Sequence, residues 1–395
     1  MSDSPLSSIS APDVGERLRL ARESKGITQK EAADVISVAR TTLVAIEQGQ
    51  RRLRIDELQR LAKLYGWSVN ALLRREAVHI DLIPRFRKVV GAEDIAAIQA
   101  TELLANLARA EVELENLLGV KRSRSYPPER PILPGDVRMQ AEQDAQELRQ
   151  RLGLGFAPIT DIVTLLELEL GIRVYVRRFD GMVSGVFAHD EALGAFILLN
   201  ANHPRERRNQ TGGHELGHFI SVRNGADVLH TNEPENSREE RYANAFGRAF
   251  LTPGGAVRQK FQEVTAGSTH LTRRHIIVMA HFFGVSREAM VRRLEELGLT
   301  KKGTWEWFGA NGGITDEQAA QVLGDLRSPD RYKLEADKPT SIRLNLLAAE
   351  AYRRELLSEG QLAKLLHLDR VELREMLEEV DPQEVEADGA PTLLA

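Results

Sequence analysis

The stretch NQTGGHELGHFIS, residues 209–221, decides how the centre of this chain folds. It contains the motif His-Glu-x-x-His, with His214 and His218 four positions apart. Residues at that spacing lie on one face of an α-helix. Two imidazoles so placed can hold one Zn²⁺, and Glu215 then lies beside the metal as a general base for water. The motif therefore predicts a helix that carries a metal site.

A second segment, SREERYANAFGRAFLTP at 237–253, is expected to supply the third ligand. Catalytic zinc sites use three protein ligands and keep one position open. Glu240, Asn244 and Gly247 share one face of a predicted helix, so a carboxylate lies on a face that can pack closely. We expect Glu240 to be the ligand in preference to Glu239, which lies one helical step away from this face. Asn244 is expected to orient one of the two histidines.

The amino-acid composition limits which metal ligands and catalytic groups the chain can use. The chain has 395 residues, a net charge of −5 and no cysteine, which excludes disulfides, iron–sulfur clusters, thiolate zinc sites and cysteine nucleophiles. Any metal must be held by histidine and carboxylate. The sequence has no apolar run long enough for a membrane span and no recognisable secretory signal. We therefore expect a cytoplasmic protein with no membrane partner.

The N-terminal segment 13–76 differs from the rest in charge. It has 13 Lys and Arg against 9 Asp and Glu, a balance of +4, so the remainder carries −9. Its pattern predicts short helices: Thr28 and Glu31 have the spacing of a capping box, and Gly49 is expected to end the third helix, 39–47. A compact basic helical module is suited to bind a polyanion.

Residues 13–76 resemble the Xre/Cro/CI helix-turn-helix family. The resemblance is carried by a glutamine that opens helix two and by the stretch from Val38 to Gly49, although Ser37 replaces the usual turn glycine. It implies a five-helix fold and a double-stranded DNA operator as partner. The residues it places against bases or phosphates are Gln29, Arg40, Thr41 and Thr42. Arg51, Arg52 and Arg54 are expected to contact phosphates, with solvated surface arginines as the alternative. The alternative is a helical interaction module that does not bind DNA.

The central segments LNANHPRERRNQTGGHELGH, 199–218, and ERYANAFGRAFLTP, 240–253, resemble blocks of the ImmA/IrrE metallopeptidase family. The resemblance implies a zincin-like, gluzincin-type fold with one Zn²⁺ per chain. Its ligands would be His214, His218 and Glu240, with Glu215 catalytic and Asn244 behind a histidine. Gly212-Gly213 and Gly247 depart from the usual Leu-Ala and Ala, and glycine weakens a helix.

The expected fold class is α+β, mostly α, with a small three-stranded sheet in the central domain. The runs typical of strands are 172–176, 183–188 and 195–200. The expected organisation is a disordered tail (1–12), the helix-turn-helix domain (13–76), a helical connector with a proline-rich linker (77–136), the metallopeptidase domain (137–300), a helical C-terminal domain (301–380) and an acidic tail (381–395).

Together the two resemblances imply a transcriptional regulator with a zinc endopeptidase domain. The implied substrate is a partner protein, an Xre-type repressor, whose cleavage would derepress stress or mobile-element genes. We also expect a homodimer. One alternative is a repressor or antitoxin-like protein whose zincin domain senses a ligand or partner without catalysis. Another is cleavage of the chain's own linker, 121–136.

Overall fold

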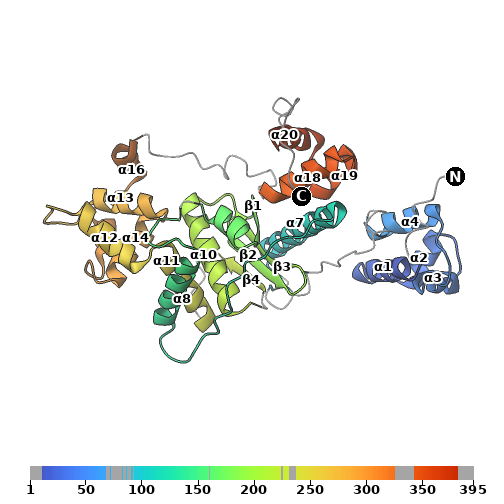
Figure 1. Cartoon of the computed structure of the whole chain (residues 1–395), viewed down its shortest axis with the longest axis horizontal. Coiled ribbons are helices and arrows are strands. Elements are labelled where there is room, and N and C mark those ends of the chain that lie inside the picture. Colours follow the sequence, from blue (N-terminus) through green and yellow to red (C-terminus); the bar gives the residue numbers. More distant parts are fainter. Residues whose placement is uncertain are drawn as a thin grey trace, which may run out of the picture. The chain divides into compact units, whose positions relative to one another are not determined.

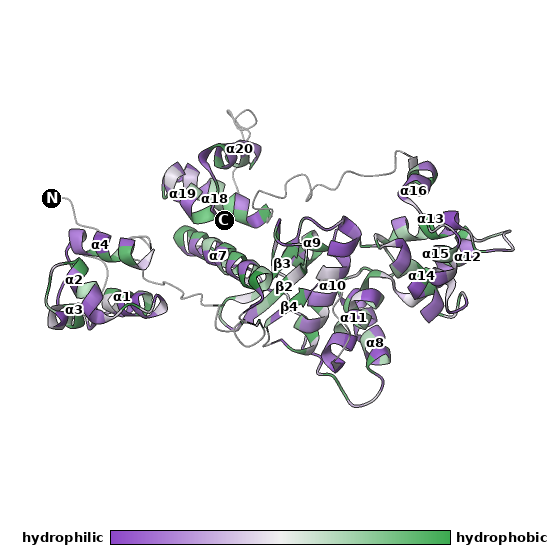
Figure 2. Ribbon diagram, turned by 180° about the vertical axis from the view of Figure 1, so that it is seen from behind, coloured by the Kyte–Doolittle hydropathy of each residue, from purple (hydrophilic) through white to green (hydrophobic). Residues whose placement is uncertain are grey.

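The computed structural model describes residues 11–67, 72, 82, 86, 90–91, 93–159, 161–223, 226–230, 237–324 and 342–380. These residues form two compact units, Met1–His79 and Ile80–Ala395 (Figure 1). In both units the helices carry hydrophobic and hydrophilic stretches, as amphipathic helices do (Figure 2). No helix among the described residues is long and apolar enough to cross a membrane. The expected acidic tail, 381–395, lies outside the described residues.

The N-terminal unit contains four described helices around one hydrophobic core. They are α1 (Ala11–Ser24), α2 (Gln29–Val35), α3 (Arg40–Glu47) and α4 (Ile55–Tyr65). The capping box at the start of α2 is confirmed: Thr28 Oγ1 accepts from the Glu31 N–H, and the Glu31 carboxylate accepts from the Thr28 N–H at 2.8 Å. Gly49 follows α3 with φ +69°, which glycine adopts without strain. A fifth helix would lie outside the described residues.

The second unit is built on a four-stranded sheet, whereas the sequence predicts three strands. The strands are β1 (Arg173–Arg177), β2 (Val183–Asp190), β3 (Gly194–Asn200) and β4 (Ala226–His230), in the order β1-β3-β2-β4. β1 is parallel to β3, and β2 is antiparallel to both β3 and β4. β4 was missed because it is a short edge strand in which only Val228 is buried.

Alternating residues of the sheet face two different cores, as the pleat requires. Val174, Phe187 and Ile197 face the core that contains the motif helix, and Tyr175 and Leu198 face the other. Helices of the first core are α8 (Val137–Arg151), α9 (Ile162–Thr164) with the π-helical turn η1 (Leu165–Glu169), α10 (Arg205–Ser221), α11 (Arg238–Leu251), α12 (Gly254–Val264), α13 (Arg273–Phe283), α14 (Arg287–Glu296), α15 (Thr304–Ala310) and α16 (Asp316–Leu323). Helices of the second core are α7 (Ile95–Leu118), α18 (Ile342–Arg353), α19 (Glu359–Leu366) and α20 (Arg370–Val380).

This division differs from the expected domain organisation. Helix α7, expected within a connector, packs against the sheet and forms a layer with α18 and α19. The segment expected as one C-terminal domain, 301–380, contributes α15 and α16 to the first core and α18 to α20 to the second. Amphipathic helical patterns do not specify which apolar surface a helix will cover, so the sequence alone did not separate these parts.

The proline-rich segment 121–136 makes hydrogen bonds and ring contacts with the rest of the second unit. Arg122 donates to the carbonyl oxygens of Gly171 and Ile172 at 3.0 and 3.1 Å. The Arg130 N–H donates to the Ile220 carbonyl at 2.8 Å, and the centroid of the Tyr126 ring lies 4.8 Å from that of a phenylalanine in α10. The segment is therefore irregular but packed, not a free tether.

A buried cluster of charges joins α7 to the sheet. Glu111 is fully buried in α7 and accepts from Arg122 and, at 2.6 Å, from the Tyr175 hydroxyl. Arg173 of β1 is 2% exposed and lies 3.6 Å from the Glu111 carboxylate. Arg343 of α18 donates to Glu115 of α7 at 3.2 Å. Because buried charges need partners, this cluster fixes α7 and α18 on the sheet.

Helices α10 and α11 cross at unusually small residues. A Cβ added to Gly213 would lie 3.1 Å from the Gly247 Cα, and one added to Gly247 would lie 2.8 Å from the backbone nitrogen of His214. One turn further, a Cβ on Gly217 would lie 2.8 Å from the Ala243 Cα. Gly213 and Gly247, both departures from the usual family residues, therefore face each other. Their small size permits the close approach and offsets their poor helix propensity.

Replacing Glu111 by alanine should strongly destabilise the second unit. The change leaves the buried Arg173 guanidinium short of a carboxylate and the Tyr175 hydroxyl without its acceptor, which should cost about 3 kcal/mol. Urea unfolding followed by circular dichroism measures the loss. Glu102→Ala on the exposed face of the same helix is the control and should change stability by less than about 0.5 kcal/mol. Equal stability of the two variants would contradict this account of the cluster.

Gly247→Ala should destabilise the protein although alanine favours helices. Its methyl group would press on the backbone of α10, and overpacking of this kind costs roughly 1–3 kcal/mol. Thermal unfolding measures the effect. Gly309→Ala is a matched control, because Gly309 also lies in a helix but has nothing within 4 Å of its added Cβ. We expect the unfolding temperature of this control to be unchanged or slightly raised. A raised unfolding temperature for Gly247→Ala would contradict a tight crossing of α10 and α11.

Candidate metal centre and DNA-recognition surface

The motif helix α10 begins after Pro204 and is almost wholly buried from Arg208 onward. Proline suits this place because it has no N–H to leave unsatisfied. His214 and His218 are 2% and 7% exposed, and Glu215 is fully buried. The histidines therefore lie on one face of a rigid helix, one turn apart.

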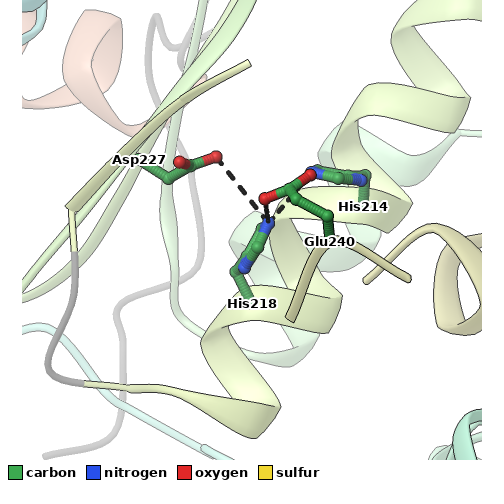
Figure 3. A group of neighbouring side chains, drawn as sticks. All are labelled: His214, His218, Asp227 and Glu240. Carbon is green, nitrogen blue, oxygen red and sulfur yellow. Dashed lines mark hydrogen bonds and ion pairs between the residues drawn. The ribbon is translucent and has the colours of Figure 1, made fainter. Parts of the chain in front are cut away.

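Side chains from three elements converge on one point (Figure 3). The Nε2 atoms of His214 and His218 lie 3.0 Å apart. The carboxylate of Glu240, in the first turn of α11, lies 3.5 Å from His214 Nε2 and 3.1 Å from His218 Nε2. The close crossing of α10 and α11 is what brings Glu240 to the histidine pair. Glu239, the alternative to Glu240 as third ligand, is exposed and is not part of the cluster.

Asn244 fixes the orientation of one histidine. Its Oδ1 lies 3.0 Å from His214 Nδ1, so His214 donates its Nδ1 proton to the amide oxygen. Nε2 of the same ring then carries a lone pair that points into the cluster. Metal-binding histidines commonly have such a partner on the other ring nitrogen.

The electrostatics of the cluster favour a positive charge at its centre. Burial, together with His218, lowers the pKa of His214 to about 4. Burial also acts against a charge on His218, but the hydrogen bond to Glu240 and the charge of Asp227 raise the pKa of His218 overall. The same hydrogen bond lowers the pKa of Glu240. The carboxylates of Glu240 and Asp227 thus favour a positive charge in the place where a cation would bind.

Glu215 is buried without any compensating contact. Neither carboxylate oxygen has a hydrogen-bond partner among the described residues. Burial first, and then the charges of Asp227 and Glu240, raise the pKa of Glu215 well above its usual value. A Cβ added to Gly185 of β2 would lie 3.1 Å from Glu215 Oε1, so this glycine leaves room for the carboxylate.

These residues fit a zinc ion. Two imidazole nitrogens and a carboxylate, 3.0 to 3.5 Å apart, have the donor types and the separation of zinc ligands. The orphaned carboxylate of Glu215 beside them lacks a polar partner that a hydrated ion could supply.

The sequence reasoning missed one member of the cluster. Asp227 of β4 has Oδ2 3.7 Å from His218 Nε2, and its ligand atom lies within 4.8 Å of those of the other three residues. No sequence motif identifies Asp227, because neither the edge strand β4 nor its register with β2 can be predicted from the sequence. The β2–β4 pairing sets Asp227 opposite Phe187, on the sheet face that α10 covers.

In the N-terminal unit, α2, the turn and α3 form the helix-turn-helix. Ser37 in the turn has φ +57°, the left-handed conformation that a glycine would adopt more easily. The buried residues of α3 are Leu43, Ile46 and Glu47. Its opposite face, at the N-terminal end, exposes Arg40 and Thr41.

A chain of polar contacts holds Arg40 in place. Arg22 of α1 and Glu47 form a buried ion pair at 2.6 Å. Gln29 Nε2 donates to Glu47 at 3.1 Å, and Arg40 donates to Gln29 Oε1 at 3.2 Å. Both polar atoms of Gln29 are therefore engaged within the unit, so in this conformation Gln29 positions Arg40.

The other sequence-predicted contact residues differ in their surroundings. Thr42 is half-buried beside the exposed Thr41, and Arg52 is exposed. Arg51 instead donates to the buried carboxylate of Glu57, at 2.9 Å. Arg52 is thus more available to a phosphate than Arg51.

Comparisons with known proteins agree with this architecture. Residues 168–295 match the family model described as IrrE N-terminal-like domain, and residues 18–72 match the helix-turn-helix model. The HTH-type transcriptional regulator ImmR of Bacillus subtilis is 37% identical over 65 residues, which are 16% of this chain and 51% of that protein. The chain thus spans about half the length of the curated relative it matches. A solved structure of Bacillus thuringiensis PlcR in complex with the peptide PapR7 and DNA aligns with 95% of this chain and 100% of that chain at 10% identity, but a TM-score of 0.15 supports no argument about the fold.

The comparisons agree with both resemblances drawn from the sequence. The chain combines an Xre-type helix-turn-helix domain at its N-terminus with a central domain of the IrrE N-terminal-like, ImmA/IrrE metallopeptidase type.

Proposed function

We propose that this protein is a DNA-binding transcriptional regulator whose central domain is a zinc-dependent endopeptidase. The observation that carries the proposal is the convergence of His214, His218 and Glu240 beside the buried, unpartnered carboxylate of Glu215. The substrate we propose is a repressor-type protein, as the family resemblance implies. Its cleavage would derepress stress or mobile-element genes.

His214, His218 and Glu240 would hold one Zn²⁺ per chain. When bound, the ion would supply Lewis-acid chemistry for peptide hydrolysis. Asn244 keeps the His214 ring turned so that Nε2 faces the site. The proposed role of Glu215 is to take a proton from the attacking water at a carboxylate oxygen and to return it to the leaving amine. Burial raises the pKa of this carboxyl, which makes it a stronger base toward a water proton.

The edge strand β4 offers a place for an extended peptide. It pairs with β2 along one edge, and no other described strand pairs with it. Asp227 in this strand reaches the metal cluster, so β4 runs beside the candidate site. A peptide could add through main-chain hydrogen bonds to the edge of β4 that no described strand occupies. An unfolded or exposed segment of a repressor would fit this mode better than a folded surface.

Glu215→Gln should abolish cleavage while leaving metal binding intact, because the amide cannot accept the water proton. We would purify Xre-type proteins encoded by the same genome and incubate each with wild type and variant of equal zinc content, following products by mass spectrometry. General-base removal should lower the rate by about 100-fold or more. Glu206→Gln, an exposed change in the first turn of the same helix, is the matched control and should cleave normally.

Cleavage by Glu215→Gln at the wild-type rate would contradict the assigned role of Glu215. If wild type cleaves none of the proteins and both forms still bind DNA, the second candidate is favoured: a regulator whose zincin domain senses without catalysis. One observation supports this candidate: Asp227 brings a fourth protein donor to the cluster, and non-catalytic zinc sites are closed by four protein ligands. Shortening of wild type alone would indicate self-cleavage.

Arg40→Ala should weaken binding to a duplex that wild type has selected from random sequence. Arg40 lies exposed at the start of α3, where recognition helices contact base edges, and a lost arginine contact costs about 1–3 kcal/mol. Fluorescence anisotropy at fixed salt measures the change, and a homodimer would select two half-sites. Arg60→Ala, an exposed arginine in α4, is the control. Equal weakening by both variants would indicate a general charge effect instead of recognition by α3.

A further inference from the structure

The metal cluster contains one more ligand than a catalytic zinc site needs. His214, His218 and Glu240 come from the two crossing helices, whereas Asp227 comes from the strand β4 (Figure 3). Its Oδ2 lies 3.7 Å from His218 Nε2. The carboxylate therefore lies on the side of the cluster that the helices leave open.

The separations suit four-coordination. Ligand atoms about 2.0–2.2 Å from a tetrahedral ion lie roughly 3.4 Å from one another. The two Nε2 atoms are 3.0 Å apart, and the Glu240 oxygens lie 3.1 and 3.5 Å from them. Asp227 Oδ2 lies 3.7 Å from His218 Nε2, and its ligand atom is within 4.8 Å of those of His214 and Glu240. A movement of the Asp227 side chain toward the cluster would place it in the fourth position, where a catalytic site would receive water or substrate.

Asp227 is the most exposed of the four candidate ligands. Its side chain is 26% exposed, against 20% for Glu240, 9% for His218 and 2% for His214. Only Val228 of β4 is buried, and the strand pairs with β2 alone among the described strands. At its end, His230 Nε2 lies 2.6 Å from Asp94, the N-cap of α7. The β2 pairing and this contact hold the strand, but withdrawal of the Asp227 side chain alone would uncover little of either core, because Val228 is the only buried residue of β4.

We propose that Asp227 is a displaceable fourth ligand that closes the metal site in the resting protein. A ligand that enters the site, including a peptide added along β4, must first remove this carboxylate. Closure would keep the endopeptidase latent until its substrate docks. The inference deepens the proposed function and rests on it for the presence of zinc.

The test compares Asp227→Ala with wild type in two binding measurements that do not depend on peptide cleavage. The first is zinc affinity in competition with a chromophoric chelator. The second is the affinity of acetohydroxamate for the cobalt-loaded protein, followed in the visible spectrum of the ion. Glu239→Ala is the matched control: it removes an exposed carboxylate whose charge also acts on His218 but which is not part of the cluster, so it separates loss of charge from loss of a ligand.

We expect the two affinities to change in opposite directions. Loss of a ligand should weaken zinc binding by about tenfold or more. Acetohydroxamate should bind Asp227→Ala about tenfold more tightly than wild type. In wild type only the fraction of sites that Asp227 leaves open can bind it, which lowers its apparent affinity, whereas in Asp227→Ala every site is open. Glu239→Ala should match wild type in both measurements. A merely structural role for Asp227 would not strengthen hydroxamate binding.

The possible outcomes separate the inference from the proposed function. Failure of wild type to bind close to one zinc per chain would overturn the proposed function. Normal zinc binding by wild type, with Asp227→Ala equal to Glu239→Ala, would overturn only the inference. Weakening of both affinities would also overturn it, because Asp227 would then support the site without blocking it. Asp227→Asn, of equal shape, provides a second variant if the alanine protein has a lowered unfolding temperature.

Discussion

The close crossing of α10 and α11 is the constraint on which the candidate site depends. Gly213 and Gly247 meet backbone to backbone, and Gly217 meets Ala243 one turn later. Only at this separation can the Glu240 carboxylate lie 3.1 Å from His218 Nε2. Glycine is a poor helix former, so these residues lower the helix propensity of α10 and α11 while they allow the two helices to approach closely. That conflict between a local preference and the global structure is typical of functional sites.

The sheet contributes the rest of the site through its edge. Its first-core face packs on α10, and its second-core face packs on α7. The buried charges around Glu111 and Arg173 fix α7 on that second face, and α7 in turn contacts the end of β4 through Asp94 and His230. The N-terminal end of α7 thus touches the strand that carries Asp227, through the contact between Asp94 and His230.

The sequence predicts those parts of the structure that depend on local periodicity. Residues four apart on a helix must share a face, so His214 and His218 were expected together, and the same reasoning assigned Glu240 and Asn244 to one side of α11. The capping box at Thr28 is equally local. Asp227 could not be predicted, because its position depends on the register between β2 and β4, which are separated in sequence by β3 and α10. The two cores likewise depend on which apolar faces meet, and Gly247 gains its meaning only beside Gly213.

The state of Glu215 distinguishes a site built for chemistry from one built for stability. A fully buried carboxyl without a hydrogen-bond partner costs about 1–3 kcal/mol, and more when it is charged. The fold maintains it nonetheless, with Gly185 leaving room beside it. A helix selected for stability alone would carry an apolar residue at this position, since the neighbouring core accepts Leu216 and Phe219 fully buried. Water and a cation beside the two histidines and Glu240 would complete the contacts of this unfavourable group. The cost of keeping Glu215 buried there supports the proposed function of the site.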